Sequence, residues 1–298
     1  MKNKTLSSRP KIDKTYYLMV LPAFLLLIGI FYPFIIGVIT SLTDKKLYSE
    51  TISFVGIMNY VNNFKNPVFL ESLRNTFVYS VLAIGIQLPL GFLVALLLDN
   101  VGKGNKMLRA ILVFPLLIPP IVSSLMWKTM MHPNSGVLNF LLGQVGLAPF
   151  PWLSGLNTAL FSLVVLDTWI FLPFTTIIIL SGLQSIPNDV IEASKIDGAN
   201  YVEIIRFIKL PWIYPYFLLT LLFRVSDSLK AFEIIYSTTR GGPLNATRTL
   251  NIMGYEEAFR WSNLGNSLSM VFLLWIFSYI ISTFLVKKWQ KSSIGGGL

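Results

Sequence analysis

The chain has 298 residues, of which 54% are hydrophobic and only 13% charged, and its mean hydropathy is +0.65. So few charges over this length exclude an ordinary soluble domain and predict a protein that crosses a membrane several times. The absence of cysteine excludes disulfides and thiolate metal sites, and the single histidine, His132, excludes a paired-histidine zinc site, so no metal site is expected. The net charge of +10 is scattered around apolar stretches, which argues against nucleic acid as a partner.

Six stretches are long and apolar enough to cross a bilayer, which takes roughly 20 mainly apolar residues. In chain order they are Tyr16–Thr40, Thr76–Leu98, Ile111–Met131, Leu156–Leu183, Trp212–Phe232 and Leu264–Val286. The first is not followed by a small-residue cleavage site, so we expect a retained signal anchor rather than a cleaved signal peptide. Proline and glycine inside several stretches predict kinks.

Lysine and arginine gather in the short connections on the side of the N-terminus, and this bias places both termini in the cytoplasm. Two longer segments, 41–75 and 233–263, are then external. The predicted organisation is a cytoplasmic tail, a transmembrane domain and a second cytoplasmic tail: residues 1–14, 15–290 (with a core at about 71–287) and 291–298. Whether the glycines at 295–297 belong to the natural chain stays open.

A polar elbow, residues 187–211, interrupts the apolar chain on the cytoplasmic side. The sequence predicts one short helix over Val190–Ile196 and a second over Tyr201–Lys209. Gly198 offers the permissive backbone at which a short helix ends, and Pro211 bends the chain into the next span.

Two pairs of residues in this elbow have the spacing of capping boxes: Asp189 with Glu192, and Asn200 with Glu203. One interpretation is that the acidic residues only cap surface helices and complement their dipoles. The other is that two capped helices joined at a glycine form a rigid element that binds a partner. The sequence favours the second interpretation.

The elbow resembles the EAA loop of ABC importer permeases in Glu192–Ala193–Ser194, Gly198, Ile208 and Leu210–Pro211, with a serine in place of the third alanine. Further stretches resemble sugar-type importer permeases in the same order along roughly residues 15–290. They are Phe54–Gly56, Asn59–Tyr60, Asn75–Thr76, Arg109–Pro115, Trp127–Lys128, Gly136–Asn139, Leu183–Pro187 and Gly241–Pro243. The chain is thus similar to permease subunits of binding-protein-dependent ABC sugar importers, of the maltose and glycerol-phosphate type.

This resemblance implies an all-α polytopic membrane protein of the type I ABC importer permease architecture, with about six transmembrane helices and the elbow as its coupling helix. It implies a bacterial or archaeal plasma membrane, a second permease subunit (a heterodimer rather than a homodimer), two cytoplasmic ATPase subunits and an extracytoplasmic solute-binding protein. The permease itself is not an enzyme. ATP and Mg²⁺ belong to the partner ATPase, because this chain lacks the G-x-x-x-x-G-K-[ST] phosphate-binding loop.

By the same resemblance, the residues in contact with the ATPase are Glu192, Ala193, Ser194, Asp197, Gly198 and Ala199. The turn Gly241–Gly242–Pro243 lies in the second external segment, which is either an ordinary solvated loop or a docking surface for the binding protein.

Charged residues inside spans are costly and tend to be functional or paired. The candidates for the substrate pathway are Asp167, Trp169, Arg224, Asp227 and Ser228. Carboxylates accept hydrogen bonds from hydroxyls, and rings cover the apolar face of a sugar, so a sugar or oligosaccharide is the expected substrate. An arginine in the pathway leaves open an anionic sugar or a polyol phosphate, and the three-residue spacing of Arg224 and Asp227 leaves open a purely structural ion pair.

Two other classes compete with a transport subunit. A membrane-embedded transferase needs clustered acids, histidines or a metal at one membrane surface, whereas Asp13, Asp44, Glu50 and Asp99 are scattered. A structural or channel subunit without energy coupling leaves the elbow unexplained.

Overall fold

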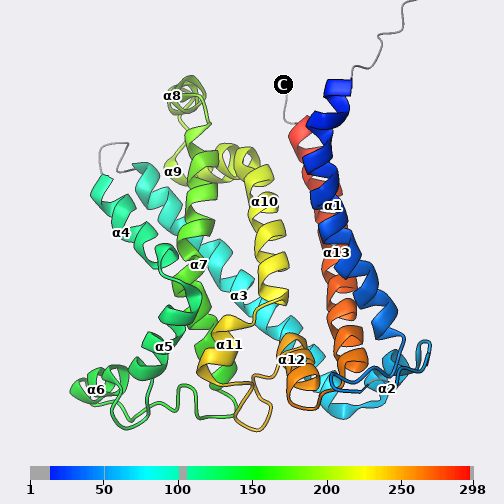
Figure 1. Cartoon of the computed structure of the whole chain (residues 1–298). Coiled ribbons are helices and arrows are strands. Elements are labelled where there is room, and N and C mark those ends of the chain that lie inside the picture. The colour runs from blue at the N-terminus through cyan, green and yellow to red at the C-terminus, as the bar shows by residue number, and fades with distance from the viewer. Residues whose placement is uncertain (1–13, 50, 101–105, 296–298) are drawn as a thin grey trace, which may run out of the picture.

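The computed structural model describes residues 14–49, 51–100 and 106–295, and its long elements are all α-helices (Figure 1). In this part of the chain, extended segments pair only at two isolated bridges, Thr43 with Phe54 and Lys46 with Asn263. The predicted all-α class is confirmed.

Five helices within the described ranges are long and apolar enough to span a membrane, and a strongly bent helix pair raises the number to six. The five are α1 (Lys14–Ser41), α3 (Pro67–Asn100), α7 (Ala159–Gln184), α10 (Leu210–Leu229) and α13 (Leu264–Gly295). They correspond to five of the six predicted stretches, although α3 begins nine residues before the predicted Thr76 and α13 continues well past Val286.

The expectation of one continuous span over Ile111–Met131 is wrong. The structure has two helices there, α4 (Lys106–Leu117) and α5 (Pro120–Met130), bent by 93° at the break. The cause is the pair of prolines: Pro119 adopts an extended backbone (φ −53°, ψ 134°), and Pro120 starts a new helix at a position where its missing N–H costs nothing.

The shorter helices gather at the two ends of the bundle. In Figure 1 the elbow helices α8 (Asn188–Ile196) and α9 (Tyr201–Glu203) lie at the top, as do the start of α1 and the end of α13. At the bottom are α2 (Met58–Lys65), α6 (Val137–Gln144), α11 (Glu233–Thr238) and α12 (Leu250–Phe259). The elbow therefore lies at the end opposite to the two long segments predicted to be external.

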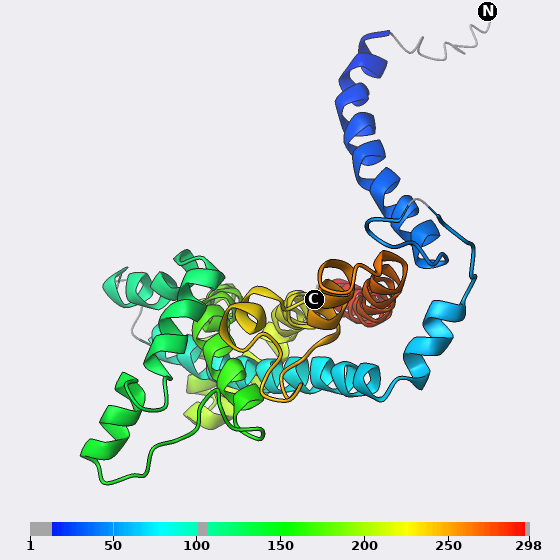
Figure 2. The same cartoon turned by 60° about the horizontal axis from the view of Figure 1, so that its bottom comes forward.

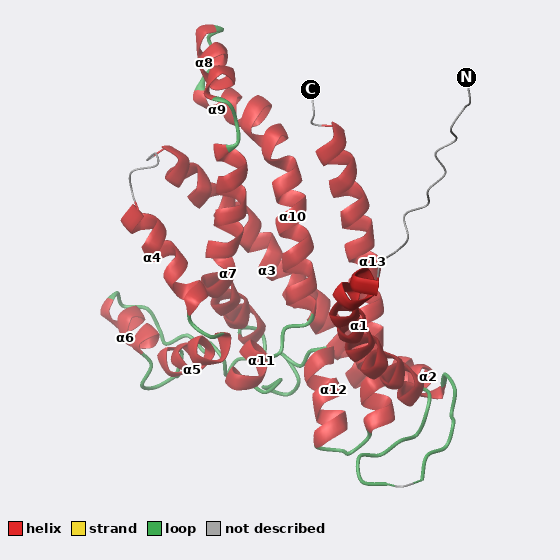
Figure 3. Cartoon of the chain, turned by 45° about the horizontal axis from the view of Figure 1, so that its top comes forward, coloured by secondary structure: helices red, strands yellow, loops and turns green. Residues whose placement is uncertain are grey.

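Helices α3, α7 and α10 form the centre of the bundle (Figure 3). Gly91 of α3 lets the backbones of α3 and α7 approach closely, since a Cβ there would lie 2.5 Å from Cγ2 of Thr175. Gly182 of α7 does the same towards α10, where its Cβ would meet the ring of Tyr216 at 2.7 Å. Small residues at such contacts are typical of membrane helix packing.

Helix α1 stands apart from this centre (Figure 2). It packs on α13, where Phe34 contacts the rings of Phe272 and Trp275. Most of its described apolar side chains are exposed, from Val20 to Ile39. An apolar helix this exposed requires lipid or another membrane chain around it.

Candidate functional site

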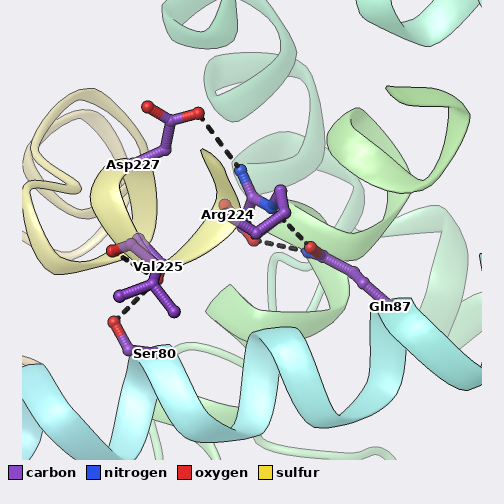
Figure 4. A network of polar contacts seen from close by, with 7 residues as sticks. Ser80, Gln87, Arg224, Val225 and Asp227 are labelled. Atoms are coloured by element: carbon purple, nitrogen blue, oxygen red, sulfur yellow. Dashed lines mark hydrogen bonds and ion pairs between the residues drawn. The ribbon is translucent and has the colours of Figure 1, made fainter. Parts of the chain in front are cut away.

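A polar network lies buried where α3, α7 and α10 meet (Figure 4). Arg224 of α10 donates from Nη2 to Oδ2 of Asp167 at 2.6 Å and from Nε to Oε1 of Gln87 at 2.7 Å. Gln87 of α3 donates from Nε2 to the same Asp167 oxygen at 2.6 Å. Three helices thus meet in one closed triangle of hydrogen bonds.

The triangle compensates for two buried charges. The side chains of Arg224 and Asp167 are only 1% and 2% exposed, and isolated charges at such positions are strongly destabilising. The carboxylate neutralises the guanidinium, Gln87 bonds to both, and the guanidinium also lies 4.1 Å from the ring centre of Phe171. The charges are therefore fixed in place by their partners.

The predicted pairing of Arg224 with Asp227 exists only as a long contact of 3.9 Å from Nη1 to Oδ2, so the principal partner of Arg224 is Asp167. Nη1 is buried and has no hydrogen-bond partner among the described residues. Asp227 is 55% exposed. A donor without a partner and an accessible acceptor thus lie next to each other.

Asp167, Arg224 and Asp227 border a cavity of about 400 Å³, which Phe171 and Phe232 also line. Carboxylate and guanidinium groups bind hydroxyls or anions, and aromatic rings cover apolar faces, so the cavity suits a small hydroxylated ligand.

Two predicted pathway residues have other roles in this structure. Ser228 accepts a hydrogen bond from Ser80 of α3 at 2.7 Å, which links α10 to α3. Trp169 packs edge-to-face on Trp127 with ring centres 5.7 Å apart and does not line the cavity. The sequence analysis missed Gln87 and Phe171; an isolated glutamine in an apolar span was a signal for the first.

At the other site, the elbow, the turn prediction is confirmed. Gly198 has φ +85°, a left-handed conformation that ends α8 and that side chains disfavour. The capping box of Asn200 and Glu203 is complete: Asn200 Oδ1 accepts from the amides of Val202 and Glu203 at 3.0 Å, and Glu203 accepts from the amide of Asn200 at 2.7 Å.

The capping box predicted for Asp189 and Glu192 is wrong. Helix α8 begins at Asn188, two residues before the predicted Val190, and its N-cap is Pro187, which makes no side-chain cap bond. Because the helix starts earlier, Asp189 lies in its first turn, where its charge complements the helix dipole instead.

The bend predicted at Leu210–Pro211 occurs without a break in the helix. A π-helical segment, η1 (Ile204–Lys209), joins α9 to α10, and the amide of Leu210 bonds to the carbonyl of Ile205, five residues back. The wider turn accommodates a proline that cannot donate. Figure 1 shows the chain crossing the top of the bundle at α9 before it turns down into α10.

The six predicted coupling residues lie together on this projecting elbow (Figure 3). Helix α8 buries none of its residues, and Ser194 and Ala199 are only partly covered. Ile196 at its tip is 86% exposed, and Val202 follows at 69%. Exposed apolar side chains on a rigid projection are typical of a surface that another protein covers.

The turn Gly241–Gly242–Pro243 lies at the end opposite to the elbow. The hydroxyl of Thr247 donates to the carbonyl of Gly242 at 2.6 Å, and Gly241 has φ +86° and packs closely on Arg248. These contacts give the turn a fixed shape.

Residues 87–291 match the sequence family described as "Binding-protein-dependent transport system inner membrane component". The trehalose/maltose transport system permease protein MalF of Thermococcus litoralis is 32% identical over 97% of this chain and 99% of that protein. The sn-glycerol-3-phosphate transport system permease protein UgpA of Agrobacterium fabrum is 30% identical over 92% of this chain and 94% of that protein.

Solved structures share the fold. A chain of a bacterial ABC transporter involved in the import of the acidic polysaccharide alginate aligns with a TM-score of 0.82 at 21% identity, over 94% of this chain and 96% of that chain. A bacterial alginate ABC transporter in complex with alginate pentasaccharide-bound periplasmic protein aligns with a TM-score of 0.80 at 22% identity, over 92% and 93%. Both agree with the architecture expected from the elbow.

Proposed function

The chain belongs to the family of binding-protein-dependent transport system inner membrane components, and we propose on that basis that it forms one half of the translocation pathway of an ATP-driven sugar importer. The observation that carries the proposal is the elbow: α8 projects from the bundle with exposed apolar side chains, and a glycine turn and a complete capping box follow it directly. Such an element transmits force without deforming.

In this proposal the elbow binds a cytoplasmic ATPase through Glu192, Ala193, Ser194, Asp197, Gly198 and Ala199. ATP and Mg²⁺ belong to that partner, and closure of the ATPase pair moves the elbow. The lack of a phosphate-binding loop in this chain supports the division of labour. The lysines and arginines on the same side as the elbow support a cytoplasmic location for it and for both termini, in the plasma membrane of a bacterium or archaeon.

A second permease completes the pathway, and we propose that it is a different chain of the same kind. The exposed apolar surface of α1 supports a membrane partner, and two cytoplasmic ATPase subunits match the two permeases. At the opposite end, an extracytoplasmic solute-binding protein docks on the surface that includes Gly241, Gly242 and Pro243. The fixed shape of that turn supports a docking role over that of a loose loop.

The substrate passes Asp167, Arg224 and Asp227, while Trp169 and Ser228 act from outside the cavity through their contacts with Trp127 and Ser80. The leading candidate is a sugar or oligosaccharide, since several carboxylates, a guanidinium and two phenyl rings line the cavity. The second candidate is an anionic sugar or a polyol phosphate, and the observation that favours it is the unpartnered Nη1 of Arg224. The names of the two relatives, one for trehalose and maltose and one for sn-glycerol-3-phosphate, are compatible with either.

The test is affinity purification of the chain from its native membrane in mild detergent, followed by mass spectrometry. We expect an ATPase subunit, a second permease and a solute-binding protein, and the ligand of that binding protein identifies the substrate. Uptake of this ligand into proteoliposomes that contain the complex and ATP completes the test. Recovery of the chain without any ATPase refutes the proposal.

A further inference from the structure

Helix α3 makes polar contacts with three separate regions of the protein, at its outer end, its middle and its inner end. It is a single helix of 34 residues, Pro67–Asn100, which makes it about 50 Å long at 1.5 Å per residue. Every one of these contacts is made by a side chain of α3 that reaches a residue more than 60 positions away in the sequence.

The outer end is fastened to the segment that follows the Gly241–Pro243 turn. Asn75 donates from Nδ2 to the carbonyl of Asn245 at 3.0 Å, and the hydroxyl of Thr76 accepts from the amide of Leu250 at 2.9 Å. Both α3 side chains are buried. The two bonds attach α3 to the backbone at Asn245 and at Leu250, the two ends of the outer loop 245–250. A displacement of α3 is therefore passed on to this outer loop.

The middle of α3 is fastened to the pathway network. Ser80 bonds to Ser228, and Gln87 bonds to both Asp167 and Arg224. Since Arg224 and Asp167 have little freedom of their own, a shift of α3 changes the position of both charges.

The inner end is fastened to the elbow. Lys209, which is 93% buried at the end of η1, donates from Nζ to Oδ2 of Asp99 at 2.6 Å. Asn100 donates from Nδ2 to the hydroxyl of Tyr201 at the start of α9. A lysine buried to this extent depends on its carboxylate, because removal of that partner leaves an uncompensated charge.

Pro89 removes one backbone hydrogen bond between the middle and the inner end of α3. The helix nevertheless continues through the proline without a break, and two residues later Gly91 packs closely on Thr175 of α7. The contacts at the outer end, the middle and the inner end therefore belong to one continuous element.

We infer that α3 is the element through which movement of the elbow reaches both the pathway and the outer loop, with Asp99 and Lys209 as the positioning residues at its inner end. The inference rests on the proposed function, because it assumes that an ATPase moves the elbow. Movement of η1 pulls α3 through the Asp99–Lys209 ion pair, α3 displaces Gln87 and with it the Arg224–Asp167 pair, and Asn75 and Thr76 carry the same displacement to the outer loop.

The test uses the complete transporter and three variants: Asp99→Asn, Lys209→Met and the exchange D99K/K209D. The measurements are ATP hydrolysis with and without the loaded binding protein, uptake into proteoliposomes, and the yield of assembled complex. We expect each single variant to lower the stimulation of hydrolysis by the binding protein about fivefold or more, a magnitude typical of coupling between sites, with normal assembly. The exchange restores the ion pair and most of the stimulation.

The matched control is Lys288→Met, which removes an exposed lysine at the same end of the bundle; its contact is with the ring of Phe284 on α13 rather than with α3, so stimulation should stay unchanged. Unchanged stimulation in both single variants overturns the inference, as does an assembled D99K/K209D complex that stimulates no better than Asp99→Asn. These outcomes leave the proposed function intact. The proposed function fails separately, if the unaltered chain assembles with no ATPase.

Discussion

The stability of the bundle centre depends on the pairing of every buried charge and hydrogen-bonding group in the Asp167–Arg224–Gln87 triangle. The variant Asp167→Leu tests this dependence. Leucine has nearly the shape of aspartate but removes the acceptor of two hydrogen bonds, one from Arg224 and one from Gln87. The guanidinium then remains buried with Gln87, the ring of Phe171 and only the long contact of 3.9 Å to the exposed Asp227. Breaking a buried pair in this way costs about 3–5 kcal/mol of unfolding free energy.

The size of this loss should shrink when the stranded groups are removed as well. In D167L/R224M neither buried charge is left, and Asp227 is exposed to solvent. Only the amide of Gln87 then lacks partners, which costs about 1–3 kcal/mol. The triple variant with Gln87→Leu removes that amide too and should return close to the stability of the unaltered chain. Transport stays low in all three variants if these charges line the pathway, so stability and transport separate.

The assay is unfolding in detergent micelles by titration with SDS, followed by circular dichroism. The three variants and the single change Arg224→Met are measured beside the unaltered chain. The reasoning fails if Asp167→Leu alone lowers the unfolding free energy by less than about 1 kcal/mol, well below the range for broken buried pairs. It also fails if the losses from the single changes simply add in D167L/R224M, since contacting residues are expected to be coupled.

Three further predictions concern local geometry. Gly198→Asp forces a side chain into a backbone with φ +85° at a cost of about 1–2 kcal/mol, and we expect it to uncouple ATP hydrolysis from transport without unfolding the spans. Stimulated ATP hydrolysis that is undiminished in this variant contradicts the prediction. The control is Gly198→Asn, because asparagine tolerates this backbone conformation better. Asn200→Ala should destabilise the start of α9 by about 1 kcal/mol, measured as faster amide exchange there, whereas Asn200→Ser keeps a cap and should exchange slowly. Gly182→Ala places a Cβ 2.7 Å from the ring of Tyr216 and should lower the melting temperature in detergent, an effect that Tyr216→Leu should relieve.

The elbow shows which local signals were sufficient. The Gly198 turn and the Asn200–Glu203 box depend only on residues within four positions of each other, and both are confirmed. The same spacing at Asp189 and Glu192 failed because Pro187 had already determined where the helix begins. Pro187 and the Asp189–Glu192 spacing both indicate a helix start within the same six residues. The proline, which restricts the backbone, determined the start, whereas the capping pair would only have added a hydrogen bond.

No local pattern in the sequence predicted which charged residues form the ion pair inside the bundle. Asp167, Arg224 and Asp227 are the charges well inside the predicted spans. Helical spacing favours Arg224 with Asp227, but the short contact is with Asp167, 57 residues earlier and on another helix. That choice depends on how α7 packs on α10, which hydropathy and spacing do not encode. The break between α4 and α5 is the converse case. Its cause, Pro119–Pro120, was visible in the sequence. The number of apolar residues in a stretch does not tell whether the helix axis changes direction within it, and so it could not predict the 93° bend.

The buried face of α3 was, in contrast, readable from the sequence alone. Thr76, Ser80, Gln87 and Gly91 follow one another at intervals of four, seven and four residues, which places them on one side of a helix with 3.6 residues per turn. A polar and small face in an otherwise apolar span turns away from lipid, because unpaired polar groups are costly there. All four residues are indeed buried, and they contact α7, α10 and the outer loop. The sequence therefore determines which side of α3 meets the rest of the protein, and the structure adds which partners it meets.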